Sequence, residues 1–381
     1  MQGNRSPRDG DSRLNLAEYQ REAFKSARID WADATKRHIP AFGAIGELGS
    51  LVSELKKSLR DGNAYTDGKE NLIEEFGDVL WYLAAICTYL DFNLAELIAE
   101  TDPIEILPGP FGHIYAMVRT IPLLTEEFEI LPPNPNRQQQ GALARSVGKS
   151  GRATVQALDA SKLDLATVLN ANIAKVRSMF GPGVAEAARC FDGAKFPIYE
   201  RLPRKLHIQF LERDRGNGKV EVMLRVNRLN IGDRLTDNAA IDDGYRYHDA
   251  FHLAYAAVLG WSPVSRAIFR CKRKSDPQKD EIEDGARAII VEEAIAHTVF
   301  NYGLGHSMLR GLDRIDHNLL KLIGRMVRNL EVKDCHLHEW QRAVLVGFKA
   351  FCCLMENRGG WLLLDADTQS LTYSRDAPDD T

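Results

Sequence analysis

The sequence lacks long apolar runs and any strong excess of charge. Its longest apolar-rich stretch, at 79–90, falls short of the roughly 18 residues that indicate a membrane span. The formal net charge is −4 over 381 residues. A balance this close to neutral gives no reason to expect nucleic acid or a membrane surface as a partner, and we expect neither.

Paired-cysteine motifs and an apolar leader are also absent. The six cysteines show no CxxC spacing, which favours reduced, mostly buried thiols. The first residues, 1–13, are polar and contain arginine, without the apolar core of a secretion signal. We therefore expect a cytoplasmic protein with a disordered tail at 1–13.

Helical periodicity is what the sequence has in abundance. Apolar residues recur at alternating spacings of three and four along 42–59 and again along 71–90, which predicts two antiparallel helices of a bundle. The first seam consists of Ile45, Leu48, Val52, Leu55 and Leu59, and the second of Leu72, Phe76, Val79, Leu83, Ile86 and Leu90. Prolines break the pattern after 103, so 103–161 is interpreted as an insertion with helices of its own, before a helix that ends at Gly181.

A change of character after Pro203 indicates a second domain. The segments 206–214 and 219–227 flank the turn sequence RGNG, which predicts a β-hairpin, and helices follow to about 357. The expected fold is therefore mainly α, with a small hairpin. The expected parts are a helical bundle domain at 14–200, a mostly helical domain at 201–370 that begins with the hairpin, and a loose tail at 371–381.

Carboxylates lie beside both apolar seams. Glu75 and Asp78 are three residues apart, and Glu47 and Glu54 are seven apart, so each pair projects from one face of its helix. If the seams pack together, the acids converge, and unpaired carboxylates held close together repel one another. A divalent cation removes this conflict. Oxygen-only ligands favour Mg²⁺ or Mn²⁺, and Mg²⁺ commonly recruits substrate phosphates, so the pattern predicts a metal–phosphate site.

The alternative interpretation is a row of solvated charges beside each seam. Two observations weigh against it. The segment 71–90 contains no lysine or arginine to pair with its acids, and Lys56 and Lys57 lie elsewhere on the helical wheel of the first segment.

Four segments, in this order, resemble one known family. They are EYQREAF, GAIGELGSLVSELKK, EEFGDVLWYLAAIC and LDLATVLNANIAKVRSMF. Together they are similar to the MazG-like nucleotide pyrophosphohydrolases of the all-α NTP pyrophosphohydrolase superfamily, over about 14–100 and 162–180. The resemblance implies a helical bundle that hydrolyses a nucleoside triphosphate to the monophosphate and pyrophosphate, with Mg²⁺, or alternatively Mn²⁺, as cofactor.

The family's metal motif is ExxE on one helix and ExxD on the next. Glu75 and Asp78 match the second half, whereas the first half has Glu47 followed by Ser50 in place of the second glutamate. The resemblance thus implies Glu47, Glu75 and Asp78 as metal ligands, with weakened binding of at least one ion. Glu54, one turn beyond Ser50, is placed to compensate in part.

Further roles follow from the same resemblance. Glu54 or Glu74 is the candidate base for a water that attacks the α-phosphorus, which makes both candidate catalytic residues together with the three metal ligands. Asn172 and Lys175 match the family's Asn-xx-Lys on its last helix and are expected to contact the phosphates or the nucleotide.

Two further expectations concern the first acidic helix and the subunits. Lys56 and Lys57, at the end of that helix, are candidate phosphate ligands, and an ordinary surface position is the alternative for each. Subunits of the superfamily usually pair, because a short set of helices cannot close its own core. This implies a homodimer, unless the second half of the chain covers the exposed face.

The second half carries its own cluster of metal-ligand residue types. His248 and His252 are four residues apart with Asp249 between them, and Glu293 and His297 are also four apart. One interpretation is a second metal or catalytic site made of His248, His252, Glu293 and His297, with Glu292 as a further member. A second is a degenerate copy of the first bundle, and a third is a helical scaffold with buried hydrogen-bonded His–Glu pairs. The loop CKRKSDPQK between the helices is basic enough to meet phosphate.

Two functions therefore stay open at this level. One is a Mg²⁺-dependent nucleoside triphosphate pyrophosphohydrolase with an appended domain. The other is a catalytically weakened nucleotide-binding or regulatory module, in which Ser50 marks the lost glutamate and the second domain is the effector. Spacing alone does not define the preferred base or sugar.

Overall fold

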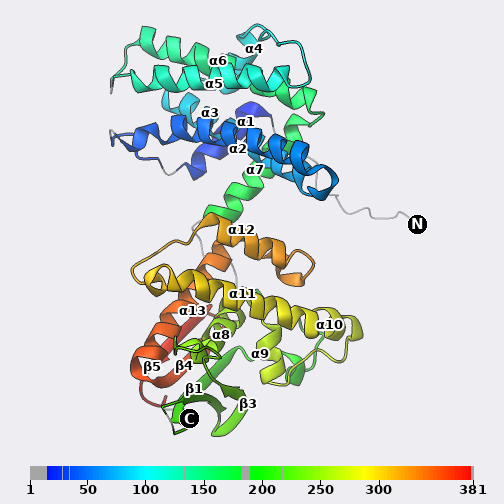
Figure 1. Cartoon of the computed structure of the whole chain (residues 1–381), viewed down its shortest axis with the longest axis vertical. Coiled ribbons are helices and arrows are strands. Elements are labelled where there is room, and N and C mark those ends of the chain that lie inside the picture. Colours follow the sequence, from blue (N-terminus) through cyan, green and yellow to red (C-terminus); the bar gives the residue numbers. More distant parts are fainter. Residues whose placement is uncertain are drawn as a thin grey trace, which may run out of the picture. The chain divides into compact units, whose positions relative to one another are not determined.

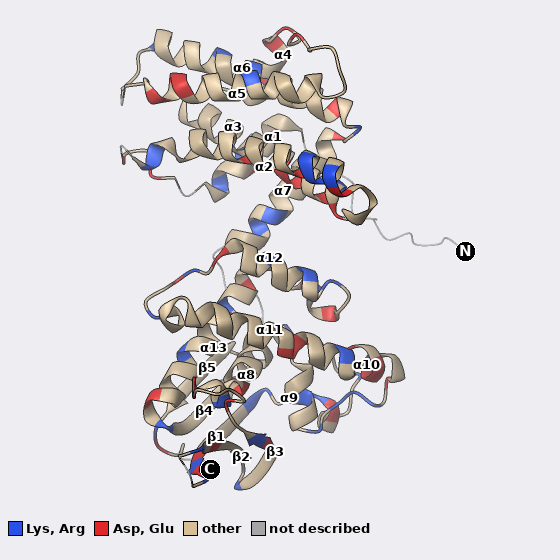
Figure 2. Cartoon of the chain, viewed as in Figure 1, with Lys and Arg blue, Asp and Glu red and all other residues tan. Residues whose placement is uncertain are grey.

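The computed structural model describes residues 15–378, apart from 28, 34, 133, 182–188 and 217. The expected disordered tail at 1–13 lies outside these residues. Within them the chain is mainly α, as the sequence predicts, with 13 α-helices and a five-stranded antiparallel sheet (Figure 1). The chain divides into two compact units, Met1–Pro182 and Gly183–Thr381. Lys/Arg and Asp/Glu residues are interspersed along the helices of both units (Figure 2).

The N-terminal unit is entirely helical in its described residues. Its helices are α1 (Leu16–Ser26), α2 (Ile39–Asp61), α3 (Gly68–Tyr89), α4 (Leu94–Glu100), α5 (Gly112–Glu129), α6 (Arg137–Ala160) and α7 (Leu165–Phe180), with short 3₁₀ helices η1 (Lys36–His38) and η2 (Gly62–Ala64). Local sequence sets several of these ends. Asn15 forms a capping box with Glu18 at the start of α1, and the Asp164 side chain caps α7. The last helix ends at Gly181, as predicted, where φ is 58°.

The expected insertion forms a second helical layer over the first. Helix α5 packs on α2, and α6 packs on α3 and α4, so the two insertion helices cover the bundle that the sequence predicts (Figure 1). Glycine permits the closest approach: a Cβ at Gly148 would lie 2.6 Å from Oγ1 of Thr101, and one at Gly151 would lie 2.7 Å from Ile98. The insertion therefore belongs to the core of this unit.

The two predicted apolar seams behave differently. The α3 seam is confirmed over Phe76–Leu90, where Phe76, Val79, Leu83 and Ile86 are fully buried. The α2 seam is only partly correct: Leu48 is buried, but Val52 and Leu59 are 39% and 69% exposed. The buried face of α2 is instead built from Ala41, Ala44, Leu48 and Leu51. Small alanines let α2 approach its neighbours on that face, which leaves its larger apolar residues pointing outward.

No single described helix has the length and apolar content of a membrane span. Only α3 and α4 taken together reach those values, and they turn by 101° where they join.

The C-terminal unit combines helices with the sheet. Its helices are α8 (Asp249–Leu259), α9 (Pro263–Ile268), α10 (Pro277–Ile282), α11 (Ala286–Leu304), α12 (His317–Met326) and α13 (Leu337–Asn357), with 3₁₀ helices η3 (Ile198–Glu200), η4 (Tyr245–Tyr247), η5 (Ser307–Leu309) and η6 (Glu331–Asp334). Its strands are β1 (Lys205–Asp214), β2 (Val220–Val226), β3 (Leu229–Leu235), β4 (Gly359–Asp365) and β5 (Ser370–Ser374). The strand order is β3-β2-β1-β4-β5.

The predicted hairpin is confirmed, but it is only part of the sheet. Strands β1 and β2 pair antiparallel with Gln209 opposite Arg225 and Asp214 opposite Val220. Strands β3, β4 and β5 were not expected from the sequence, and β5 occupies the start of the expected loose tail. Strand β4 begins almost directly after α13, so the sequence pattern of its leucines resembles a continuation of that helix. Strand β3 is a mostly exposed edge that contains Asn, Gly and Asp, which are poor strand formers.

The core of this unit lies around α8. All its residues from Asp249 to Leu259 are buried, and the helix packs against α13 and against β4 and β5. A helix enclosed in this way, packed on a sheet, differs from the paired helices of the N-terminal unit. The interpretation of this half as a degenerate copy of the first bundle is therefore wrong.

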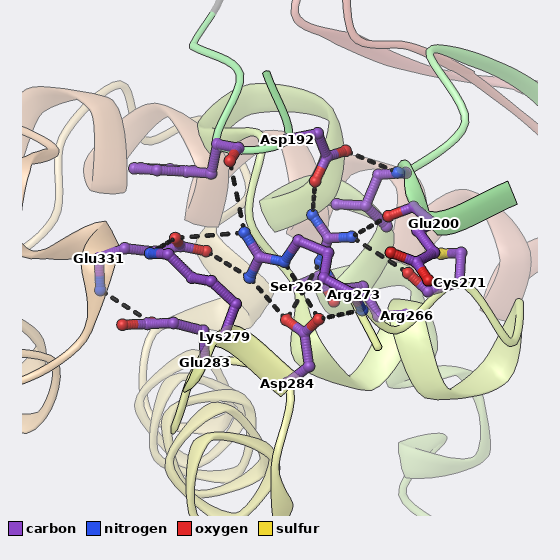
Figure 3. A network of polar contacts seen from close by, with 12 residues as sticks. Asp192, Glu200, Ser262, Arg266, Cys271, Arg273, Lys279, Glu283, Asp284 and Glu331 are labelled. Atoms are coloured by element: carbon purple, nitrogen blue, oxygen red, sulfur yellow. Dashed lines mark hydrogen bonds and ion pairs between the residues drawn. The ribbon is translucent and has the colours of Figure 1, made fainter. Parts of the chain in front are cut away.

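A buried ionic network fixes the basic loop between α9 and α10 (Figure 3). Arg273 is fully buried and pairs with Asp284 at 2.6 Å and with Glu331 at 2.6 Å, and Lys279 also pairs with Glu331 at 2.6 Å. Arg266 pairs with Asp192 in the same network. Charges that are buried and paired in this way hold loops together, and removing one partner is costly. Arg273 is thus structural, and its buried charge is not available to phosphate; for the rest of the loop, contact with phosphate stays a prediction.

Candidate functional site

Three carboxylates from two packed helices converge in the N-terminal unit. Glu47 lies on α2, and Glu75 and Asp78 lie one turn apart on α3. One oxygen from each lies within 4.8 Å of the other two, and all three residues are half-buried. The structure therefore brings together the three predicted metal ligands.

The electrostatics of this carboxylate cluster (Glu47, Glu75 and Asp78) show that its charges are poorly compensated. Burial and a hydrogen bond with Glu47 raise the pKa of Glu75 to about 8. Burial also raises the pKa of Asp78 to about 6, even though Lys175 acts in the opposite direction. Carboxyl groups whose pKa lies this far above the ordinary value favour protons or a metal cation over the free anion.

Helix α7 contributes the two other predicted residues. The Nδ2 group of Asn172 donates to Oδ1 of Asp78 at 2.7 Å. The ammonium group of Lys175 pairs with Glu74 at 2.6 Å and also with Asp78. Asn172 and Lys175 thus stand at the edge of the carboxylate cluster, and Glu74 is linked to it through Lys175.

Tyr19 on α1 supports this edge and was not singled out from the sequence. Its buried hydroxyl donates to Oδ1 of Asn172, at 2.7 Å, which orients the amide so that its Nδ2 faces Asp78. The close approach of α3 and α7 also requires Gly77, because a Cβ there would lie 2.8 Å from Cβ of Asn172. The signal for Tyr19 was present in EYQREAF, but a single tyrosine on an amphipathic helix reads as ordinary core.

The remaining predicted residues of this unit lie outside the cluster. Glu54 is buried and accepts hydrogen bonds from Lys57 at 2.6 Å and from Asn71 at 3.0 Å. The Glu54 carboxylate and the Lys57 ammonium group therefore form an ion pair with each other. Lys56 is exposed and lines a separate groove between α2 and α5. Glu54 sits two turns from Glu47 and does not fill the position that Ser50 leaves without a carboxylate.

The C-terminal unit holds a second cluster at the start of α8. His248, Asp249 and His252 are buried, and one ligand atom of each lies within 4.8 Å of the others. Glu293 on α11 joins them: its Oε2 lies 3.5 Å from Nε2 of His252 and 3.9 Å from Nε2 of His248. We call these four residues the histidine cluster.

Two predicted members of that site behave differently. Glu292 turns to the other side of His252, where its Oε1 lies 2.8 Å from Nδ1 of that ring. His297 is exposed and pairs with Asn301 at 2.9 Å, so it does not join the cluster. Burial would lower the pKa of His252, but Glu292 and Glu293 outweigh that effect and raise it to about 10.

These observations define a mainly α protein of two units, each of which carries a cluster of metal-ligand side chains on packed helices. The chain belongs to the family described as the MazG C-terminal domain, whose model matches residues 186–377. The matched residues include the histidine cluster, whereas the carboxylate cluster lies outside them. No solved structure matches the chain.

One curated relative adds a short region of similarity. Gene 37 protein of Mycobacterium phage L5 is 39% identical to this chain over 57 residues, which make up 14% of this chain and 50% of the phage protein. The similarity therefore spans half of that relative and a small part of this chain.

Proposed function

We propose that the N-terminal unit is a Mg²⁺-dependent nucleoside triphosphate pyrophosphohydrolase, which releases pyrophosphate and leaves the monophosphate. The observation that carries the proposal is the convergence of Glu47, Glu75 and Asp78 within 4.8 Å of one another. The family match supports a MazG-related protein with a nucleotide-related role, and the motif in the N-terminal half supports the finer assignment.

The donor set fits a hard divalent cation. All three groups offer carboxylate oxygens, which Mg²⁺ and Mn²⁺ prefer. Burial and the charges of neighbouring acids raise the pKa values of Glu75 and Asp78, and a bound cation would offset the repulsion between these charges. When bound, the ion would neutralise phosphate oxygens and lower the pKa of a water that attacks the α-phosphorus. Three ligands in place of the four in the family motif favour weaker binding of a second ion.

Residues around the carboxylate cluster would position the substrate, orient the carboxylates and accept a proton. Lys175 holds its ammonium group between Glu74 and Asp78, where it can shift toward the phosphates of an incoming triphosphate. Asn172 fixes Asp78, and Tyr19 fixes Asn172, so the cluster is oriented before the substrate arrives. Glu74 becomes the better candidate base, because it is linked to the carboxylate cluster through Lys175, whereas Glu54 lies outside the cluster and is paired with Lys57.

We also propose that this unit acts as a homodimer in the cytoplasm. Helices α2 and α5 leave apolar side chains outside the core, around a groove of about 480 Å³ that includes Val52, Leu59, Tyr115 and Val118. A contiguous apolar face of this kind commonly marks a protein interface. Pairing through it would cover the outward-facing part of the α2 seam.

The test is an assay of the full chain with Mg²⁺ or Mn²⁺ and a panel of canonical and modified triphosphates, in which pyrophosphate and orthophosphate are both measured. Pyrophosphate release is expected. In the nearly isosteric Asp78→Asn variant we expect activity to fall at least about 100-fold, because a ligand charge is lost at the reacting phosphates. The matched control is Glu70→Gln, which removes an exposed acid from the same helix. Unchanged turnover in Asp78→Asn, or orthophosphate as the sole product, would refute the assignment.

A regulatory module that binds nucleotide without cleaving it is the second candidate. Ser50 favours this second candidate. Among the described residues, the cluster contains only Glu47, Glu75 and Asp78, so no other carboxylate replaces the missing glutamate. Ser50→Glu separates the two. A gain of hydrolysis from an inactive wild type supports a decayed site, and unchanged turnover supports a site that works with three acids.

A further inference from the structure

We propose that the histidine cluster of the C-terminal unit binds one divalent transition-metal ion, of the Zn²⁺ or Co²⁺ type, through His248, Asp249, His252 and Glu293. This site differs in chemistry from the carboxylate cluster, and the family match assigns it no role.

The ligand atoms already have nearly the right separations. Nε2 of His248 lies 3.6 Å from Oδ1 of Asp249 and 3.9 Å from Oε2 of Glu293, and Nε2 of His252 lies 3.5 Å from the same Glu293 oxygen. Two ligands bound to Zn²⁺ at tetrahedral angles lie about 3.3 Å apart, given bonds of about 2.0–2.1 Å. These three separations exceed that value by only a few tenths of an ångström, and the ligand atoms of His248, Asp249 and His252 all lie within 4.8 Å of one another. Side-chain shifts would bring the set around one ion.

Both imidazole rings are oriented by their other nitrogen. Nδ1 of His248 lies 2.8 Å from the carbonyl oxygen of Tyr245, which can only accept a hydrogen bond, so in the neutral ring Nδ1 carries the proton and Nε2 has the lone pair that a metal needs. Nδ1 of His252 faces the Glu292 carboxylate at 2.8 Å. This is the carboxylate–histidine arrangement that supports metal ligands in proteins.

The Glu292 carboxylate is itself held in place. Oγ of Ser262 donates to its Oε1 at 2.6 Å, and the backbone N–H of Val264 donates to its Oε2 at 2.8 Å. The adjacent acids Glu292 and Glu293 thus have different roles. Glu292 orients the His252 ring through Nδ1, and Glu293 lies on the Nε2 side, among the proposed ligand atoms.

An unsatisfied atom points to the ion. Nε2 of His252 is buried and has no hydrogen-bond partner, and the residue is 0% exposed. Buried polar atoms are nearly always partnered, so a buried imidazole nitrogen whose 3.5 Å contact with Oε2 of Glu293 is not a hydrogen bond needs an explanation. A bound ion supplies one.

The donor set selects the class of metal. Imidazole nitrogen combined with carboxylate oxygen suits Zn²⁺, Co²⁺, Mn²⁺ or Fe²⁺, whereas Mg²⁺ and Ca²⁺ prefer oxygen alone. The Glu293 side chain is 42% exposed, while His248, Asp249 and His252 are buried. The ion would therefore be reached from the Glu293 side.

The rival explanation is a metal-free ion pair, in which a protonated His252 is shared between Glu292 and Glu293. The two explanations differ in what they predict for added metal. Only a metal site takes up one equivalent of Co²⁺ with the strong visible absorption of a low-coordinate nitrogen-ligated ion and releases it to Zn²⁺.

The experiment uses the full chain, stripped with a chelator and titrated with Co²⁺ in excess Mg²⁺, so that the carboxylate cluster is occupied. We expect one Co²⁺ per chain, displacement by Zn²⁺ and a raised melting temperature. His252→Ala should abolish the absorption, and Glu293→Gln should weaken Co²⁺ binding at least tenfold. Glu292→Gln should weaken it about 10–100-fold, as for other outer-shell partners.

Controls separate this site from the rest of the molecule. His297→Ala removes a histidine one turn beyond Glu293 that lies outside the cluster and should leave Co²⁺ binding unchanged. Asp78→Asn should also leave it unchanged, so this proposal and the proposed hydrolase fail independently. Because His252→Ala empties a buried position and can unfold the unit, the exposed Glu293→Gln is the decisive variant. Absence of Co²⁺ uptake by the wild type, or uptake unaffected by Glu293→Gln, would overturn the proposal.

Discussion

Each cluster contains a side chain in an electrostatically unfavourable environment. In the carboxylate cluster, Glu75 keeps a proton near neutral pH because burial and Glu47 disfavour its charge. In the histidine cluster, Nε2 of His252 is buried without a hydrogen-bond partner. Groups of this kind are costly in a fold and are commonly found where a ligand or an ion binds.

The pH dependence of Mg²⁺ binding follows from Glu75. Its pKa is raised from an ordinary value of 4.5 to about 8, so the folded protein holds this proton more tightly than the unfolded chain does. As the pH rises from 4.5 toward 8, the metal-free fold loses stability, while Mg²⁺ binding, which displaces the proton, becomes stronger. Between pH 6 and pH 8 we expect Mg²⁺ affinity to rise by up to about tenfold per pH unit for each proton released.

Isothermal titration calorimetry in two buffers of different ionisation enthalpy measures both the affinity and the protons released. Glu75→Gln has no proton to release at this position and should lose most of the pH dependence, although its affinity is lower throughout. An affinity for Mg²⁺ in the wild type that is equal at pH 6 and pH 8 would contradict the assigned pKa.

Pairs of helices position the side chains of both sites. The carboxylates depend on α2 and α3, and the groups that orient them depend on α1 and α7. The contact between α3 and α7 is especially close at Gly77, where a Cβ would lie 2.8 Å from Cβ of Asn172. A change in this contact should therefore affect stability and activity together.

Gly77→Ala should separate α3 from α7. We expect a loss of about 1–3 kcal/mol in the free energy of unfolding, as for other overpacked cores, and reduced turnover because Asn172 and Lys175 move away from Asp78. Urea denaturation and the pyrophosphate assay measure the two effects. Gly49→Ala on α2 is the matched control: a Cβ there has nothing within 4 Å, so it should stabilise the helix by roughly 0.5–1 kcal/mol. Equal stability changes in the two variants would count against the close contact.

Local sequence predicts a helix or strand well where a single periodic pattern determines it. It predicts less well which residues of that element are buried, because this depends on the neighbouring elements. Spacing predicted that acids of the two helices would converge, but it grouped Glu54 with Glu47, and the structure places Glu54 outside the cluster. The choice of Glu47, Glu75 and Asp78 came from the family resemblance. The outward face of α2 could not be predicted, since Ala41 and Ala44 pack more closely than the larger residues and take the buried side. The different tasks of Glu292 and Glu293 also depend on where Ser262 and Val264 lie, which sequence spacing does not reveal.

At the scale of the whole molecule, the chain consists of two compact units with different architectures. The N-terminal unit closes its core with the helices of its own insertion, and the C-terminal unit closes its core on a sheet that the sequence revealed only as a hairpin. Strand β4 was not predicted because its partner β1 lies far away in the sequence, and pairing between distant segments produces no local sequence pattern that would reveal it. The family match covers residues 186–377, in the C-terminal unit, whereas the residues of the proposed hydrolase site lie in the N-terminal unit.

Substitutions in the α2–α5 groove test the proposed homodimer. Leu59→Asp places a charge on an apolar side chain that is 69% exposed, and we expect it to convert a dimer into a monomer in size-exclusion chromatography with light scattering. Ile130→Asp changes a side chain that is 81% exposed and lies outside the groove, so it should stay dimeric. A monomeric wild type, or a dimer that persists in Leu59→Asp, would contradict this interface.

The most direct measurement is diffraction from crystals of the full chain soaked in Mn²⁺, with data collected at an X-ray energy where manganese scatters anomalously. We expect an anomalous peak within bonding distance of carboxylate oxygens from Glu47, Glu75 and Asp78. Anomalous density that avoids these three side chains at saturating Mn²⁺, for example density confined to the histidine cluster, would contradict it.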